Sequence, residues 1–369
     1  MRLRFVIALV LASGCSSSEH NASVPIDAGG GDSSINVTPV EDAGADVGPV
    51  DAGLDCTKDV ELDGLPRHLA CTDFFVADKK PFTPGFVFWS DGAAKQRWVV
   101  FPPSGTIDIT SFDEWKLPVG IELWKEFAID GKKIETRLYK KLPAGWKHTT
   151  YRWNDAQTDA VRKDAGETVM LANRTPFEVP STSQCDYCHA AHEEPVLGFD
   201  AVSLGVSTAQ GVTLATLAAD GKFSATPPVT TLSIPDDATG KAAAAMGWMH
   251  ANCGNCHVDR VGAGGYGSTF RMRLSAAQLM TAASATELPA YVTGYCKPSE
   301  RVDPMTAGFY SYIEGTKPTS SLSSILAHSR ATPGQESVLT QMPPIVTHQP
   351  DGTGVALLDA WITALPVCN

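Results

Sequence analysis

The sequence predicts a multidomain α+β protein, with an N-terminal antiparallel β domain followed by an α-helical region. Two observations support this fold class. Short runs of alternating apolar and polar residues, separated by turn signals, fill residues 80–180. Beyond residue 180 the chain changes to Ala-rich runs that are compatible with helices. At 369 residues the chain is long enough for two or three domains.

The first fifteen residues have the pattern of a secretory signal. Met1-Arg2-Leu3-Arg4 is basic, an apolar run follows from Phe5 to Ala12, and Ser13-Gly14-Cys15 closes it. The run is too short to span a bilayer. Cys15 with the serines after it resembles the lipobox of bacterial lipoproteins, and Ser16 favours outer-membrane sorting by that resemblance. We therefore expect residues 1–15 to be a lipoprotein signal peptide and Cys15 to be lipidated, so that the protein is exported and faces the periplasm or the cell surface. A cleaved signal with an incidental cysteine is the alternative.

Residues 16–55 are predicted to be a disordered acidic linker. They hold mostly Ser, Asp, Gly, Ala, Val and Pro, with no Lys or Arg. Such a composition cannot bury enough apolar surface to offset the entropy of ordering. Much of the net charge of −12 lies here, and no basic cluster suggests nucleic acid.

Residues 56–180 form the predicted β-rich domain. Asp130-Gly131 between two alternating runs is a strong hairpin signal, and Ser90-Asp91-Gly92 is a similar break. The expected strands are Phe86–Trp89, Arg97–Phe101, Ile121–Ile129, Lys133–Tyr139 and Trp146–Trp153.

Two further segments follow, residues 181–236 and residues 237–369. The run from Lys241 to Asn252 predicts a helix. A terminal helix is predicted from apolar residues at helical spacing, namely Val355, Leu358, Trp361, Ile362 and Leu365.

Each of these segments carries one C-x-x-C-H motif. The first is Cys185, Cys188 and His189, and the second is Cys253, Cys256 and His257. Two cysteines at this spacing reach the two vinyl groups of one porphyrin edge, while the histidine presents its imidazole to the iron. The pattern therefore predicts two covalently bound haem c groups. A redox dithiol would need a βαβ context, and a zinc site would need four ligands, which only the two motifs together could supply.

A distal ligand is predicted for the second haem. Met342 lies in Gln341-Met342-Pro343-Pro344-Ile345, just before the terminal helix. A methionine on a Pro-containing loop closes the distal side in class I cytochromes c, whose layout the helix before the second motif and the terminal helix also resemble. For the first haem no single ligand is preferred. The candidates are Met170, His192, Met246, Met249 and His250.

Four cysteines remain outside the motifs and Cys15, namely Cys56, Cys71, Cys296 and Cys368. In an oxidising compartment they favour two disulfides, for which three pairings are possible. We favour Cys56 with Cys71 and Cys296 with Cys368 because each pair lies within one predicted domain. Free buried thiols are the alternative.

Several stretches together resemble a family of bacterial exported dihaem c-type cytochromes. They are the two haem motifs, Met342-Pro343-Pro344, Phe88–Ala93, Leu117–Gly120, Lys133–Leu138 and Tyr151–Ala160. The resemblance covers roughly residues 80–365 and implies electron transfer, with a β domain of unassigned role. The long segment between His257 and Met342 departs from a minimal cytochrome.

The expected function is that of a dihaem electron carrier rather than an enzyme, with a redox partner protein and a membrane anchor as its partners. A dihaem peroxidase is one alternative, although the stretch from His189 to His257 is short for a complete domain. A monohaem cytochrome whose β domain binds a partner or a glycan is the other.

Overall fold

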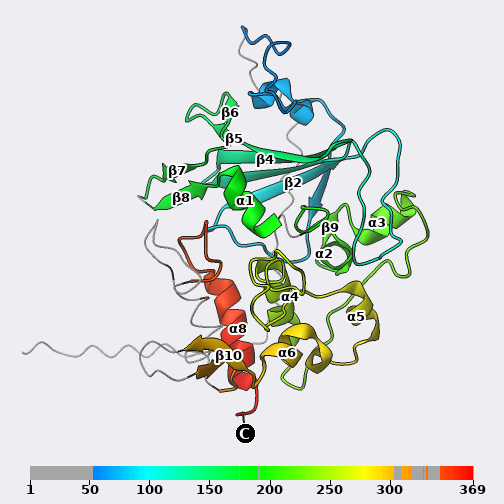
Figure 1. The fold of residues 1–369 in the computed structure, drawn as a ribbon, viewed down its shortest axis with the longest axis vertical. Helices are drawn as coiled ribbons and strands as arrows, with labels where there is room; N and C mark the ends of the chain where they lie inside the picture. Colours follow the sequence, from blue (N-terminus) through cyan, green and yellow to red (C-terminus); the bar gives the residue numbers. More distant parts are fainter. Residues whose placement is uncertain are drawn as a thin grey trace, which may run out of the picture. The chain divides into compact units, whose positions relative to one another are not determined.

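The computed structural model describes residues 53–173, 175–189, 192–302, 309–316, 327, 330 and 341–368, which belong to one compact unit. Cys15, the predicted signal and most of the predicted linker lie outside these residues. A seven-stranded antiparallel sheet dominates the N-terminal half, and helices follow it, so the fold is mixed α+β (Figure 1). The order of its strands is β6 (Ala160–Arg162), β5 (Gly145–Trp153), β4 (Lys132–Leu142), β3 (Glu122–Ile129), β2 (Ala94–Val100), β1 (Lys80–Thr83) and β9 (Gln210–Gly211).

The central hairpin follows the sequence pattern closely. Asp130 and Gly131 join β3 to β4 with φ angles of 51° and 75°. Positive φ at both turn residues matches the right-handed twist of the flanking strands, which is why Asp-Gly is favoured there. Four of the five predicted strands correspond to β2, β3, β4 and β5.

The predicted strand at Phe86–Trp89 is wrong. These residues form an irregular segment, and the strand before the Ser90-Asp91-Gly92 turn is β1 instead. The backbone of the segment bonds to a side chain of the later helix α4 (Ala242–Asn252) rather than to a neighbouring strand. The Trp89 N–H donates to Oδ1 of Asn252 over 2.7 Å, and Nδ2 of Asn252 donates to the Val87 carbonyl over 2.8 Å.

The two faces of the sheet belong to different clusters of buried side chains. One face carries Trp124, Leu138 and Tyr151 and is covered by the segment that includes Leu69 and Phe74. The other face contributes to the largest cluster, which also includes side chains from every later segment through Leu365. The predicted domain boundaries remain predictions, but this cluster draws on all three predicted segments.

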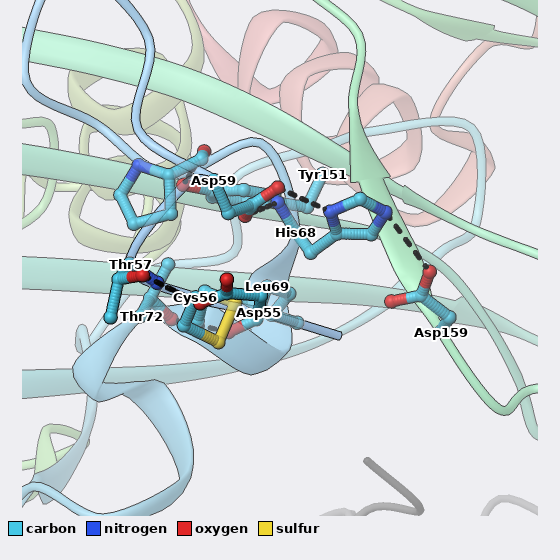
Figure 2. Close-up of a disulfide and its surroundings, with 11 residues drawn as sticks. Asp55, Cys56, Thr57, Asp59, His68, Leu69, Thr72, Tyr151 and Asp159 are labelled. Carbon is cyan, nitrogen blue, oxygen red and sulfur yellow. Dashed lines mark hydrogen bonds and ion pairs between the residues drawn. A yellow bond between two sulfur atoms is a disulfide. The ribbon is translucent and has the colours of Figure 1, made fainter. Parts of the chain in front are cut away.

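The segment over the first face is held by a disulfide. Cys56 is bonded to Cys71, which ends the 3-10 helix η1 (Leu69–Cys71), and η2 (Asp73–Phe75) follows. Figure 2 shows His68 beside this disulfide, between the carboxylates of Asp59 and Asp159. The segment is thus attached to the sheet by both packing and polar contacts.

The remaining elements are short, apart from two helices. Two small antiparallel ribbons form from β7 (Glu167–Met170) with β8 (Pro176–Val179), and from β10 (Pro298–Val302) with β11 (Phe309–Ser311). The helices are α1 (Thr182–His189), α2 (Ala201–Gly205), α3 (Leu214–Ala219), α4, α5 (Ala276–Thr281), η3 (Ala285–Glu287), α6 (Pro289–Gly294) and α8 (Gly352–Ala364). Cys296 is bonded to Cys368, so both disulfides are the pairs favoured above.

Both helices predicted in the C-terminal part are present, as α4 and α8. Val355, Leu358, Trp361 and Ile362 are buried on α8, as the helical spacing predicts. The two helices pack at Gly354, where an added Cβ would lie 1.8 Å from Nε1 of Trp248. That nitrogen donates to Asp351 over 2.7 Å, and the other oxygen of Asp351 accepts from the Gly354 N–H and caps α8. No helix in the described ranges is long and apolar enough to cross a membrane.

Candidate functional site

The first C-x-x-C-H motif lies on α1, a helix that the sequence analysis did not predict. Ser181 and Gln184 form a reciprocal cap at its start. The Gln184 N–H donates to Oγ of Ser181 over 3.3 Å, and Oε1 of Gln184 accepts from the Ser181 N–H over 2.8 Å. Ser followed three residues later by Gln is the signature of a capping box, so the sequence did hold a signal for this helix. The helix places Cys185 and Cys188 three residues apart on one face.

The histidine of the first motif is oriented by two contacts. Its Nδ1 lies 2.6 Å from the Pro195 carbonyl, and its ring stacks on Tyr139 with centroids 4.9 Å apart. Because a carbonyl oxygen only accepts, Nδ1 must carry the proton, and in the neutral ring the lone pair then belongs to Nε2. Burial lowers the pKa of His189 to about 3, which keeps the ring neutral.

The second motif begins where α4 ends, as predicted. Cys253 caps the helix, and its carbonyl accepts from the N–H groups of Cys256 and His257 over 3.0 and 2.8 Å. His257 repeats the arrangement of the first histidine, with Nδ1 3.0 Å from the Phe270 carbonyl. This contact again assigns the lone pair of the neutral ring to Nε2.

These residues have the donor set that a c-type haem needs. Metal-ligating histidines donate their other ring N–H to a carbonyl or carboxylate, which fixes the tautomer and the orientation of the ring. Both motif histidines have such a carbonyl partner. In addition, the buried Tyr139 hydroxyl beside His189 has no hydrogen-bond partner in the described part of the chain. A polar group is therefore left for a ligand to satisfy at the first motif.

The two motifs are in contact with each other. The thiols of Cys188 and Cys256 act on each other, which raises the pKa of Cys188 and lowers that of Cys256. Tyr187 packs against Gly264, where an added Cβ would come within 3.0 Å of its ring. The loop after the first motif also reaches the second, because Nε2 of His192 lies 3.1 Å from the Asn255 carbonyl. The fold thus brings both attachment points together although about 65 residues separate them.

Three of the four motif cysteines have a raised thiol pKa. All four are free thiols, and burial raises the pKa of Cys185 and raises that of Cys253 to about 12. Catalytic dithiols require a lowered pKa on the attacking sulfur. Cys256 has a lowered pKa, but its cause is the hydrogen bond from Cys188 in the other motif. Among the described residues, no group of three or more His, Cys, Asp and Glu side chains converges to hold a metal ion.

Met342 is half-buried, and the chain a few residues after it is bonded to Trp89 and Asp91. The carboxylate of Asp91 accepts from the N–H groups of His348 and Gln349 over 2.7 and 3.1 Å, and the Trp89 indole donates to the Gln349 carbonyl over 2.8 Å. Asp91 and Trp89 belong to the Phe88–Ala93 stretch on which the resemblance partly rests. That stretch joins residues 341–349, called the Met342 segment below, to the turn that leads into β2.

The candidates for the distal ligand of the first haem lie in the core, on the surface or in hydrogen bonds with the backbone. Met246 and Met249 are buried in the largest core cluster, whereas Met170 is 62% exposed on β7. Nδ1 of His250 accepts from the Leu274 N–H over 3.0 Å, and Nε2 of His192 lies beside the Asn255 carbonyl.

Comparison with known proteins found no match: no family model, no curated protein and no solved structure is similar to the chain.

Proposed function

We propose that the protein is an exported dihaem c-type cytochrome that transfers electrons. The observation that carries this proposal is the repeated orientation of the two motif histidines, each with Nδ1 donating to a backbone carbonyl. Cys185, Cys188 and His189 would hold one haem, and Cys253, Cys256 and His257 the other. Haem iron supplies one-electron chemistry whose potential depends on the axial ligands and on burial.

The contact between the motifs supports electron transfer rather than two independent sites. Tyr187 against Gly264 and His192 beside the Asn255 carbonyl keep the two attachment points close, which favours rapid electron exchange between the redox groups. The C-terminal part, with α4 leading into the second motif and α8 packed against α4, supports a layout like that of class I cytochromes c. The β domain then acts as the support of the site, through Tyr139 at the first motif and Asp91 at the Met342 segment.

Met342 is proposed as the distal ligand of the second haem because it lies on a Pro-containing loop before α8. Asp91 fixes the backbone at the far end of that loop, at His348 and Gln349. Met342→Ala should remove the weak sulfur-to-iron charge-transfer band of the oxidised protein and lower one reduction potential, because thioether ligation raises the potential. An unchanged band and potential would assign the site to another residue.

A carrier and a peroxidase are distinguished by their reactivity. Electron transfer favours filled axial positions, whereas peroxide chemistry needs an open distal position. The half-reduced protein should therefore be inert to peroxide and to carbon monoxide in stopped-flow mixing. Rapid catalytic consumption of peroxide, or stoichiometric binding of carbon monoxide at one haem, would overturn the carrier assignment.

Anchoring through a lipidated Cys15 completes the proposal, because several acyl chains hold a protein stably on a membrane. Cys15→Ser should release the protein into the soluble fraction of the cell. Continued membrane association of this variant would count against the lipoprotein signal.

A further inference from the structure

A row of basic side chains crosses the sheet beside the first motif. Arg97 on β2 lies directly opposite Lys125 on β3, which lies directly opposite Arg137 on β4. The three side chains therefore share one face of the sheet. Arg97 is only 8% exposed. Like charges at directly opposite positions destabilise a sheet, and burial increases that cost because water no longer screens them.

Only one cation of this row has an anionic partner in the part of the chain that the structure describes. Glu135, which is fully buried, accepts from Nε and Nη2 of Arg137 over 2.8 and 2.5 Å. Arg97 and Lys125 have aromatic neighbours instead: the Phe88 ring centroid lies 5.7 Å from the Arg97 guanidinium, and that of Phe127 lies 4.8 Å from Nζ of Lys125. Lys95, on the same face, donates to the Ala93 carbonyl over 3.0 Å.

The row lies next to the first motif. Tyr139, which stacks on His189, is two residues from Arg137 on β4, so both point to the same face. Arg137 and Lys125 also act electrostatically on the Cys185 thiol. Helix α1 packs against β5, whereas Arg97 is on β2, at about 10 Å from Arg137 across two strand spacings. Arg97 is thus the member of the row furthest from the motif cysteines.

Burial lowers the pKa of Arg97 to about 10 and that of Lys125 well below its usual value. A carboxylate beside them would stabilise their charged forms, so the site is suited to an anion. We infer that Arg97 and Lys125 bind a carboxylate, and that this carboxylate is a propionate of the haem attached at Cys185 and Cys188. The inference rests on the proposed function. A haem carries its propionates on the edge opposite the vinyl groups that bond the cysteines, and Arg97 lies on the side away from those cysteines. Guanidinium groups suit this task because they bind carboxylates in a bidentate manner.

Two neutral variants of the holoprotein, Arg97→Gln and Lys125→Gln, test the inference. Lys147→Gln is the matched control, because it removes a positive charge from an exposed position of the same sheet. Each test variant should shift the reduction equilibrium of one haem toward the oxidised form by about tenfold, or about 59 mV for a one-electron couple. Arg97→Lys should restore most of the potential. Both test variants should also unfold at a lower temperature than the control, because each leaves a propionate unpaired.

Two outcomes would overturn the inference while leaving two haems per chain. One is that both potentials stay at the control values. The other is that the variants become more stable, as expected if the cations were unpaired in the holoprotein. Titration of the wild-type protein with formate at constant ionic strength separates the two sources of carboxylate. No change is expected, and a saturable shift in potential would assign the site to a free anion. A chain with only one haem would instead refute the proposed function at the first motif.

Discussion

The packing of α4 against α8 positions the second motif, and Gly354→Ala tests it directly. The new methyl group would lie 1.8 Å from Nε1 and 2.2 Å from Cε2 of Trp248, closer than real Cβ contacts come. Either the helices separate or the indole moves, and in the second case the hydrogen bond to Asp351 is lost. Since Cys253 caps α4, both responses also disturb the second motif.

The expected cost follows from three contributions. Overpacking costs about 1 to 3 kcal/mol, and loss of a hydrogen bond to a charged group costs about 1.5 to 3 kcal/mol. Replacing glycine by alanine within a helix stabilises the helix by about 1 kcal/mol. If the indole moves, we therefore expect Gly354→Ala to lower the free energy of unfolding by about 1.5 to 5 kcal/mol, measured by urea denaturation followed by circular dichroism.

Gly352→Ala is the control. Gly352 lies on the same helix, and a Cβ added there meets nothing within 4 Å. It should leave the stability unchanged or raise it by up to about 1 kcal/mol. Adding Trp248→Ala to Gly354→Ala should cost much less than Trp248→Ala alone, because removing the indole also removes the clash. If Gly354→Ala and Gly352→Ala unfold at the same urea concentration, the described packing of the two helices is wrong.

Three further predictions concern contacts that stabilise the fold. Asp91→Ala removes the acceptor of two backbone N–H groups, so we expect the free energy of unfolding to fall by about 2 to 5 kcal/mol. The charge-transfer band of Met342 should also weaken. An unchanged band would show that Asp91 does not position Met342. The hydrogen bonds from Arg162 lower the pKa of Asp63 to about 2, so the stabilisation is complete above pH 4 and is lost as the pH falls toward 2. Asp63→Asn should therefore destabilise the protein at pH 7 and much less at pH 2, and an equal loss at both would refute the ion pair. The Cys296–Cys368 disulfide, with a separation of 72 residues, should contribute about 4 kcal/mol, and Cys296→Ser with Cys368→Ser tests this value by denaturation under non-reducing conditions.

The part of the fold that the sequence predicts well is the part that local patterns determine. The alternation of residues 121–153 and the Asp130-Gly131 turn specify the central strands, and the apolar spacing from Val355 onward specifies α8. The segment Phe86–Trp89 has the aromatic composition of a strand, but its hydrogen bonds go to Asn252, more than 160 positions away in the chain. No local pattern contains that contact, and therefore the prediction failed.

The candidate site shows the same division. Spacing alone identifies the four cysteines and two histidines of the motifs, but the carbonyl partners Pro195 and Phe270 and the contact between the motifs depend on the tertiary fold. The basic row was overlooked for a related reason. In the sequence, Arg97, Lys125 and Arg137 alternate with apolar residues, which is the pattern of an exposed polar face. Only the register of the three strands places these side chains next to one another on a covered face of the sheet.

The number of haems per chain tests the central claim most directly. A pyridine haemochrome assay on the purified protein should give two haems per chain. Cys185→Ala with Cys188→Ala should reduce the ratio to one, and Cys253→Ala with Cys256→Ala should do the same, because each pair provides one set of thioether bonds. A ratio near one in the wild-type protein that does not change when Cys185 and Cys188 are replaced would contradict the dihaem assignment, and absence of haem would contradict the function itself.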